Sequence, residues 1–89
     1  IMGCGHAGVA NTLDYVRELA PGPIRAVIGG FHLSRADRPR WERVEAALRR
    51  HEVEKVIPCH CTGEEASRYL VEKLGNRCRP GRAGDVFRF

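Results

Sequence analysis

Short apolar runs alternate along this chain with longer segments whose apolar residues recur at helical spacing. The apolar runs are residues 1–2, 24–28, 53–57 and 86–89, and the middle two are rich in the β-branched side chains that strands favour. Helices that join short strands in this way make right-handed crossovers between parallel strands. The pattern therefore predicts an α/β fold of roughly βαβαβαβ order with a largely parallel sheet.

Capping residues set the expected helix boundaries. The first helix is predicted to begin at Asn11 and to end at the Pro-Gly-Pro sequence of residues 21–23. The second is expected over residues 39–50, with a proline in its first turn, and the third from a Thr62 cap to Gly75. The side chains expected to face the core are Leu13, Val16, Ala20, Trp41, Val44, Leu48, Ala66, Tyr69, Leu70 and Leu74.

Composition limits the chain to one small domain and excludes several classes of function. Its 89 residues can bury only about 60 to 65% of the unfolded surface, which leaves no room for a second core. The net charge is +4, but the arginines are scattered without interleaved aromatic residues. This favours a solvated helix face or an anionic small molecule over nucleic acid. No stretch has the ~20 apolar residues that span a bilayer, so we expect a soluble, cytoplasmic protein without membrane contact.

Three loops that should follow the strands each contain a histidine. They read GCGHAG over residues 3–8, GGFHL over 29–33 and PCHCTG over 58–63. In an open parallel sheet, such loops gather outside the carboxyl ends of the strands, where ligands bind. The histidines of the three loops, His6, His32 and His60, are therefore expected to converge on one rim although they lie far apart in the sequence.

Imidazole and thiolate are common ligands of zinc and related metals, so this rim is a candidate metal site. His60 and His6 are the expected ligands, whereas His32 is as suited to contacting substrate or transferring a proton as to binding metal. Cys4, at a strand end, can face the site or fill space as a buried thiol. The alternative for His60 is a loop histidine that only hydrogen-bonds a carbonyl. Zinc is favoured, with iron or manganese as other possibilities.

The remaining residues of the third loop have two readings. If the strand persists, alternation sends Cys59 and Cys61 to the side opposite His60, where they would pack beneath it. A rival is a structural zinc site built from Cys4, His6, Cys59 and Cys61. Thr62 and Gly63 open the third helix, whose N–H groups could dock an anionic part of a substrate, although an ordinary capped helix start explains them equally.

Three motifs carry a resemblance to a known family. GCGHAGVANTL, AVIGGFHL and PCHCTGEEA, in this order, resemble the C-terminal half of the metallo-β-lactamase superfamily, in its dihydropterin–ribofuranosylaminobenzene phosphate synthase-like branch, associated with methanopterin biosynthesis. The resemblance implies an αββα sandwich with one or two metal ions, commonly zinc, that activate water. It places His60 as a ligand of the second metal and His32 near the substrate. Cys4 and His6 occupy the region of a metal-bridging aspartate, and either could be the ligand.

The family's first metal motif, HxHxDH, is absent from these residues. Residues 1–89 are therefore expected to form a single partial domain of a metal-dependent hydrolase or transferase that acts on a phosphate-bearing pterin-type small molecule. The chain alone should be inactive, and its partner should be the missing N-terminal half, another chain or a second copy, which would cover an exposed strand edge. The alternative is a non-catalytic metal-binding or assembly module.

Overall fold

Two short parallel strands form the centre of the molecule. In the computed structural model, which describes residues 1–89, β1 (Ala26–Gly30) pairs with β2 (Lys55–Cys59) in parallel. Ala26 lies opposite Lys55, and Gly30 lies opposite Cys59. Both strands therefore end at the same edge of the sheet, as the α/β prediction requires.

On each side of this two-stranded sheet, one further residue forms an isolated β-bridge to the neighbouring strand. Met2 bridges to Gly29 beyond β1, and Cys78 bridges to Val56 beyond β2, both in parallel. The predicted first strand, residues 1–2, is thus reduced to one bridge. The two predicted middle strands are therefore real, and the segment beside β2 contains Cys78 instead of the predicted residues 86–89.

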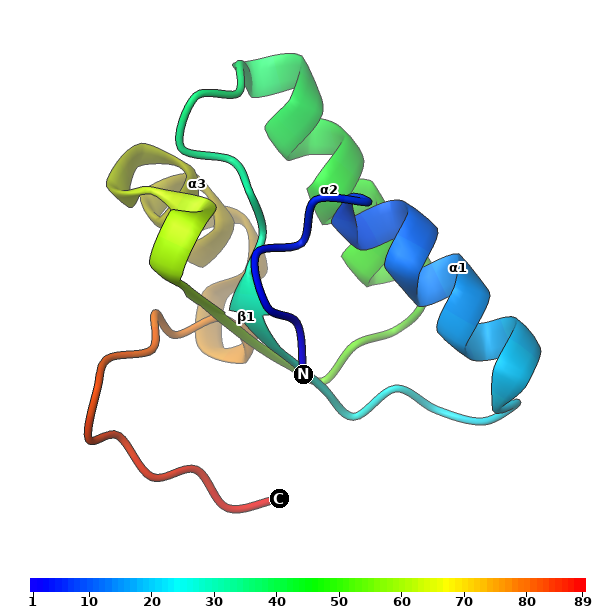
Figure 1. Cartoon of the computed structure of the whole chain (residues 1–89). Helices are drawn as coiled ribbons and strands as arrows, with labels where there is room; N and C mark the ends of the chain where they lie inside the picture. The colour runs from blue at the N-terminus through cyan, green and yellow to red at the C-terminus, as the bar shows by residue number, and fades with distance from the viewer.

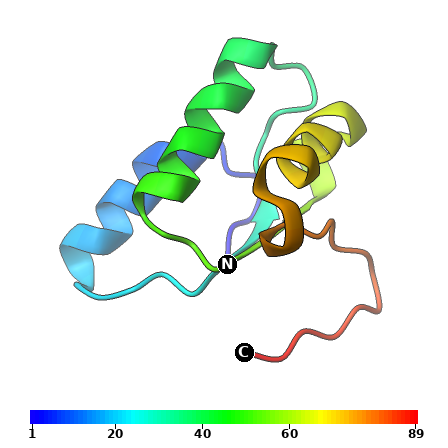
Figure 2. The same ribbon diagram turned by 180° about the vertical axis from the view of Figure 1, so that it is seen from behind.

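Three helices cover one face of this sheet (Figures 1 and 2). They are α1 (Val9–Leu19), α2 (Arg38–Arg50) and α3 (Glu64–Leu74), and α2 contacts both of the others. Two 3₁₀ turns, η1 (His60–Thr62) and η2 (Gly75–Arg77), precede and follow α3. No helix is both long and apolar enough to span a lipid bilayer.

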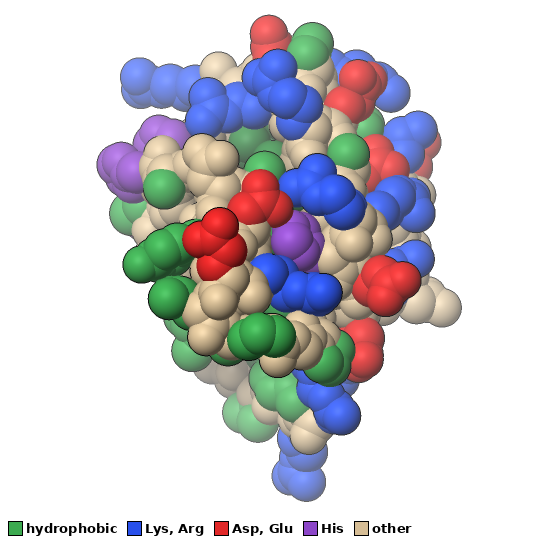
Figure 3. Space-filling model, turned by 90° about the vertical axis from the view of Figure 1, so that its right-hand side faces the viewer, with side chains coloured by type: hydrophobic (Ala, Val, Ile, Leu, Met, Phe, Trp, Pro, Cys, Tyr) green, Lys and Arg blue, Asp and Glu red, His purple; other side chains and the backbone are tan.

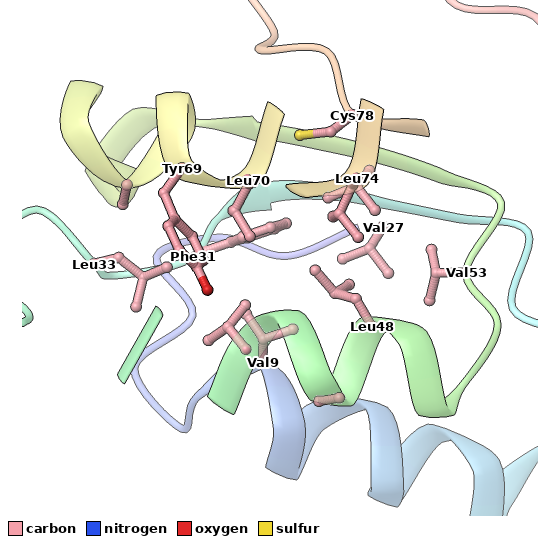
Figure 4. Close-up of a cluster of buried hydrophobic side chains, with 14 of the residues drawn as sticks. Val9, Val27, Phe31, Leu33, Leu48, Val53, Tyr69, Leu70, Leu74 and Cys78 are labelled. Atoms are coloured by element: carbon pink, nitrogen blue, oxygen red, sulfur yellow. The ribbon is translucent and has the colours of Figure 1, made fainter. Parts of the chain in front are cut away.

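The core lies between the sheet and the helices (Figure 4). Val27 of β1 packs there with Leu48 of α2 and Leu70 of α3, all nearly inaccessible to solvent. Ile57 of β2 is also buried but lies outside this cluster, since successive strand residues point to opposite faces. The core therefore occupies one face of the sheet, and no helix covers the other.

The first helix differs from its prediction. It begins at Val9, after Gly8 with φ 88°, and the side chain of Asn11 donates a hydrogen bond to the Ala7 carbonyl instead of capping. The helix buries Val9 and Leu13, whereas the expected core residues Val16 and Ala20 are exposed. The predicted start was wrong because Gly8 adopts a positive φ that permits the turn before Val9, and no other element covers Val16 and Ala20.

The other two helices largely follow the sequence. In α2, the Asp37 carboxylate accepts from the Arg40 backbone N–H, and the expected residues Val44 and Leu48 are buried while Trp41 is half-buried. In α3, all four expected residues are buried, and Gly75 with φ 58° follows the last turn. Amphipathic spacing was sufficient here because both helices have a single apolar face.

A partly buried polar contact joins α2 to α3. The Tyr69 hydroxyl donates to Glu45 at 2.7 Å, and Arg49 pairs with the other oxygen of that carboxylate at 2.8 Å. Burial, followed by the bond to Glu45, raises the pKa of Tyr69 to about 12. The same hydrogen bond holds the pKa of Glu45 below its usual range. The pair therefore stays a neutral phenol and an ionised carboxylate across the neutral pH range.

The predicted strand at residues 86–89 is wrong. This segment has no strand, and Val86 is 80% exposed. The place beside β2 is taken by an earlier segment, because the Arg79 N–H donates to the Val56 carbonyl and the Gly81 N–H to the Pro58 carbonyl. The C-terminal residues run on as an extended tail (Figure 1).

Candidate metal centre

The three histidine loops meet at the carboxyl edge of the sheet. The Gly30 N–H donates to the Gly3 carbonyl at 2.8 Å, which ties the first loop to the second. The N–H groups of Leu33 and Ser34 both donate to the Cys61 carbonyl at 3.1 Å, which ties the second loop to the third. The predicted convergence of the loops therefore holds in the structure.

Two cysteines and one histidine form a tight group at this edge. The Cys4 thiol lies 3.3 Å from His60 Nε2, and the Cys61 thiol donates to the Cys4 carbonyl at 3.1 Å. The two sulfurs and the nearest ring nitrogen all lie within 4.8 Å of one another. Tetrahedral zinc, with bonds of about 2.0 to 2.3 Å, needs ligand atoms roughly 3.5 Å apart, so small rotations suffice for this set to bind the ion. We call Cys4, His60 and Cys61 the cysteine–histidine cluster.

A local turn brings Cys61 into this cluster. β2 ends at Cys59, and His60 adopts the left-handed φ of 55° at the start of η1. The turn rotates Cys61 toward Cys4, so the prediction that strand alternation places Cys61 away from His60 was wrong. A left-handed non-glycine residue costs about 1 kcal/mol, and such strain is concentrated at functional sites. Cys59 remains outside the cluster.

Glycine at the end of β1 makes room for the cluster. A Cβ on Gly30 would lie 2.7 Å from the Cys61 sulfur and 2.7 Å from the Gly3 carbonyl oxygen. Real Cβ atoms do not approach so closely, so a side chain at this position would push Cys61 away from Cys4. The absence of a side chain at Gly30 therefore leaves the space that the Cys61 sulfur occupies.

The other two rim histidines form a separate pair. The His6 and His32 rings stack with centroids 4.4 Å apart and an angle of 28° between their planes. Both side chains are exposed, and neither belongs to the cysteine–histidine cluster. We call them the histidine pair. The predicted metal ligand His6 thus lies against the predicted catalytic residue His32, and both roles stay predictions.

The predicted anion site at Thr62 and Gly63 gains no support from these contacts. Thr62 is only 1% exposed, and its hydroxyl accepts from the Phe31 N–H and donates to the Cys59 carbonyl. It joins β1 to η1 and does not cap α3, so its predicted capping role was wrong. Gly63 precedes α3, whose first turn carries Glu64 and Glu65. Two carboxylates at this position oppose an anion.

The remaining cysteine, Cys78, belongs to the core. It is buried, and desolvation raises the pKa of its thiol to about 11. A thiol held protonated is a poor metal ligand. Cys61 was a ligand only in the rival prediction of a structural zinc site, and the preferred prediction packed it beneath His60. The Thr62-Gly63 pair is the signal that favours its place in the cluster, because these residues favour a turn over a continued strand.

His60 lines a cleft of about 640 Å³. It lies between the end of β2, the first turns of α3 and residues 80–82, and its lining includes Ser67, Arg68 and Arg82. A space of this size suits a small organic molecule. His60 therefore both contacts the Cys4 thiol and lines an open cleft.

Comparisons with known proteins find sequence relatives that this chain matches over part of their length. No protein-family model matches the chain. It is 31% identical over 90 residues to the 7,8-dihydropterin-6-methyl-4-(β-D-ribofuranosyl)-aminobenzene-5'-phosphate synthase of Methanocaldococcus jannaschii, covering 100% of this chain and 31% of that protein. An uncharacterized protein of the same organism is 33% identical over 66 residues, 74% of this chain and 25% of that protein.

A solved structure extends the likeness to the fold. Tm1679, described as a metal-dependent hydrolase of the β-lactamase superfamily, superposes with a TM-score of 0.87 at 35% identity, covering 93% of this chain and 32% of that one. The 89 residues span about a third of the length of the first relative and of this structure. The chain, with its parallel βαβ core and histidine rim, belongs to the metallo-β-lactamase superfamily.

Proposed function

We propose that the cysteine–histidine cluster binds a divalent metal, zinc in preference to iron or manganese. The observation that carries this is the placement of three donor atoms from Cys4, His60 and Cys61 within 4.8 Å. Two thiolates and one imidazole are a soft donor set that suits zinc. The description of Tm1679 as metal-dependent supports a metal of some kind in this superfamily.

We further propose that the chain contributes this centre to an enzyme that hydrolyses or transfers a group on a phosphate-bearing pterin-type small molecule. The name of the M. jannaschii relative supports this substrate class. When bound, the metal activates a water molecule. His32 holds or accepts a proton at an exposed ring nitrogen beside the site, and the cleft next to His60 orients the organic part of the substrate.

The 89 residues alone are proposed to be inactive. The cysteine–histidine cluster is the one group of three or more metal-binding side chains that lies close together here, whereas a dinuclear site needs about twice as many ligands. The four free cysteines fit a reducing compartment, and we propose the cytoplasm. A non-catalytic metal-binding module is the second candidate, because thiolate-rich donor sets are typical of structural zinc sites.

Cobalt binding by variants of Cys59 and Cys61, the two cysteines that flank His60, tests whether the cysteine–histidine cluster is the metal site. Cys61→Ser is expected to abolish the thiolate-to-cobalt charge-transfer band contributed by its sulfur and to weaken Co²⁺ binding at least about tenfold, because one ligand of three is lost. Cys59→Ser, outside the cluster, should keep the wild-type spectrum and affinity. The measurement is a Co²⁺ titration followed by absorption, and equal behaviour of the two variants would contradict the proposal.

A polypeptide partner is proposed for the Met2 side of the sheet. Ile1 is fully exposed there, and Val16 and Leu19 are exposed on α1. Ile1, Val16 and Ile24 line a small apolar groove. Exposed apolar edges of this kind are usually covered. We expect the chain to self-associate in sedimentation equilibrium and Val16→Lys to reduce the association. A wild-type monomer at high protein concentration would refute a second copy as the partner.

A further inference from the structure

A polar hollow of about 330 Å³ adjoins the histidine pair. It lies between the loop after β1 and the first turn of α2, and its lining residues are His32, Ser34, Arg35, Ala36 and Arg40. No acidic side chain lines it. The His32 ring that forms one wall is the ring that stacks on His6, so the hollow opens directly beside the rim. The motifs discussed above do not account for its two arginines.

These two arginines lack partners within the chain. The ion pairs of the molecule involve other cations, and neither Arg35 nor Arg40 donates a side-chain hydrogen bond. The nearest acidic residue in sequence, Asp37, uses its carboxylate to cap α2. The first turn of α2 contains no acidic residue, so its dipole adds to the positive potential. Figure 3 shows lysine or arginine side chains directly above histidine side chains at the upper left of this face.

Backbone hydrogen bonds tie the wall of the hollow to the metal centre. Leu33 and Ser34 both donate to the Cys61 carbonyl, and Ala36 donates to the Leu33 carbonyl at 3.0 Å. Ser34 and Ala36, two of the residues that line the hollow, are therefore linked through Cys61 to the cysteine–histidine cluster. A group bound in the hollow would be placed at a defined position relative to the cluster.

We propose that this hollow binds the phosphate group of a phosphomonoester. Two guanidinium groups present forked N–H donors that match phosphate oxygens, and their two positive charges neutralise a dianion. A carboxylate carries a single negative charge, so two arginines favour phosphate over a carboxylate. The Ser34 hydroxyl and the His32 ring supply further donors. The proposal deepens the proposed function, since the phosphate would belong to the molecule that reacts at the metal. The binding step itself requires no metal.

The test uses chelator-treated, metal-free protein, so that phosphate cannot bind through an ion. Inorganic phosphate, ribose 5-phosphate and ribose are titrated into ¹⁵N-labelled chain and followed by amide chemical shifts. Both phosphates are expected to shift residues 32–36 and 40, whereas ribose should not. Arg35→Gln/Arg40→Gln should weaken phosphate binding at least about tenfold, as charge-assisted hydrogen bonds are lost.

The matched control is Arg17→Gln/Arg77→Gln, which removes the same charge from two exposed arginines outside the hollow. It should retain the wild-type affinity. Equal weakening in both double variants would show a diffuse charge effect and overturn the proposal, as would shifts elsewhere or no phosphate binding. Cobalt binding is measured separately on the cysteine–histidine cluster. Absence of phosphate binding would therefore not contradict the metal centre. Absence of cobalt binding would not account for a loss of phosphate binding, because phosphate is titrated into metal-free protein.

Discussion

Gly29→Ala is expected to unfold the chain or leave it only marginally stable. Gly29 has φ 138°, a conformation that other residues rarely adopt, and an added Cβ would overlap the Met2 carbonyl oxygen. Backbone strain and steric overlap each cost about 1 to 3 kcal/mol. Their sum is a large part of the few kcal/mol that stabilise a small domain. Urea denaturation followed by circular dichroism measures the loss.

Gly3→Ala is the matched control for this substitution. Gly3 follows Met2 in the same loop, but an added Cβ there would meet no atom within 4 Å, and its φ is not in the positive range. Its free energy of unfolding should stay within about 0.5 kcal/mol of wild type. A Gly29→Ala midpoint equal to that of Gly3→Ala would mean that the Met2 bridge is not formed.

His60→Gly is expected to weaken Co²⁺ binding at least about 100-fold. Loss of a residue that only supports a ligand costs about 10- to 100-fold in affinity, and removal of a ligand should cost no less. The metal-free protein should not lose stability, because glycine adopts the left-handed φ of 55° at this position without the backbone strain that a side chain causes. Its free energy of unfolding is expected to be unchanged or higher by up to about 1 kcal/mol. Titration with Co²⁺ and urea denaturation give the two measurements.

His32→Gly is the control for His60→Gly, because it also replaces a left-handed histidine by glycine but removes no proposed metal ligand. His32 has nearly the same φ, 53°, and is also exposed, but it lies in the histidine pair and not in the cluster. It should show the same relief of strain and keep the wild-type cobalt affinity. If His32→Gly weakened cobalt as much as His60→Gly, the metal would be held between the two groups, and the proposed ligand set would be wrong.

Helices whose apolar residues share one face could be predicted from the chain alone. The spacing in α3 identified Ala66, Tyr69, Leu70 and Leu74 correctly, because amphipathic periodicity and burial have the same cause. The convergence of the three histidine loops was also predictable, since parallel strands with helical crossovers must end at one edge of a sheet. The family resemblance followed from the same loops.

Pairing and local turns were decided by the tertiary structure. Residues 86–89 form a short apolar run like that of a strand, yet a strand needs a neighbour, and residues 78–81 already occupy that side of β2. Cys61 entered the cluster because one left-handed residue, His60, ended the alternation of β2. The unpaired Arg35 and Arg40 became a candidate site only when folding placed them around one hollow.

The sequence by itself determined the α/β class, two amphipathic helices and the edge of the sheet where histidines gather, because these depend on periodicity and topology. Only the tertiary structure decided which side chains of that edge meet. It placed Cys61 with Cys4 and His60, and it paired His6 with His32. Such contacts depend on backbone turns of a few residues and on close approaches that glycine permits, and neither has a period that can be read along a chain.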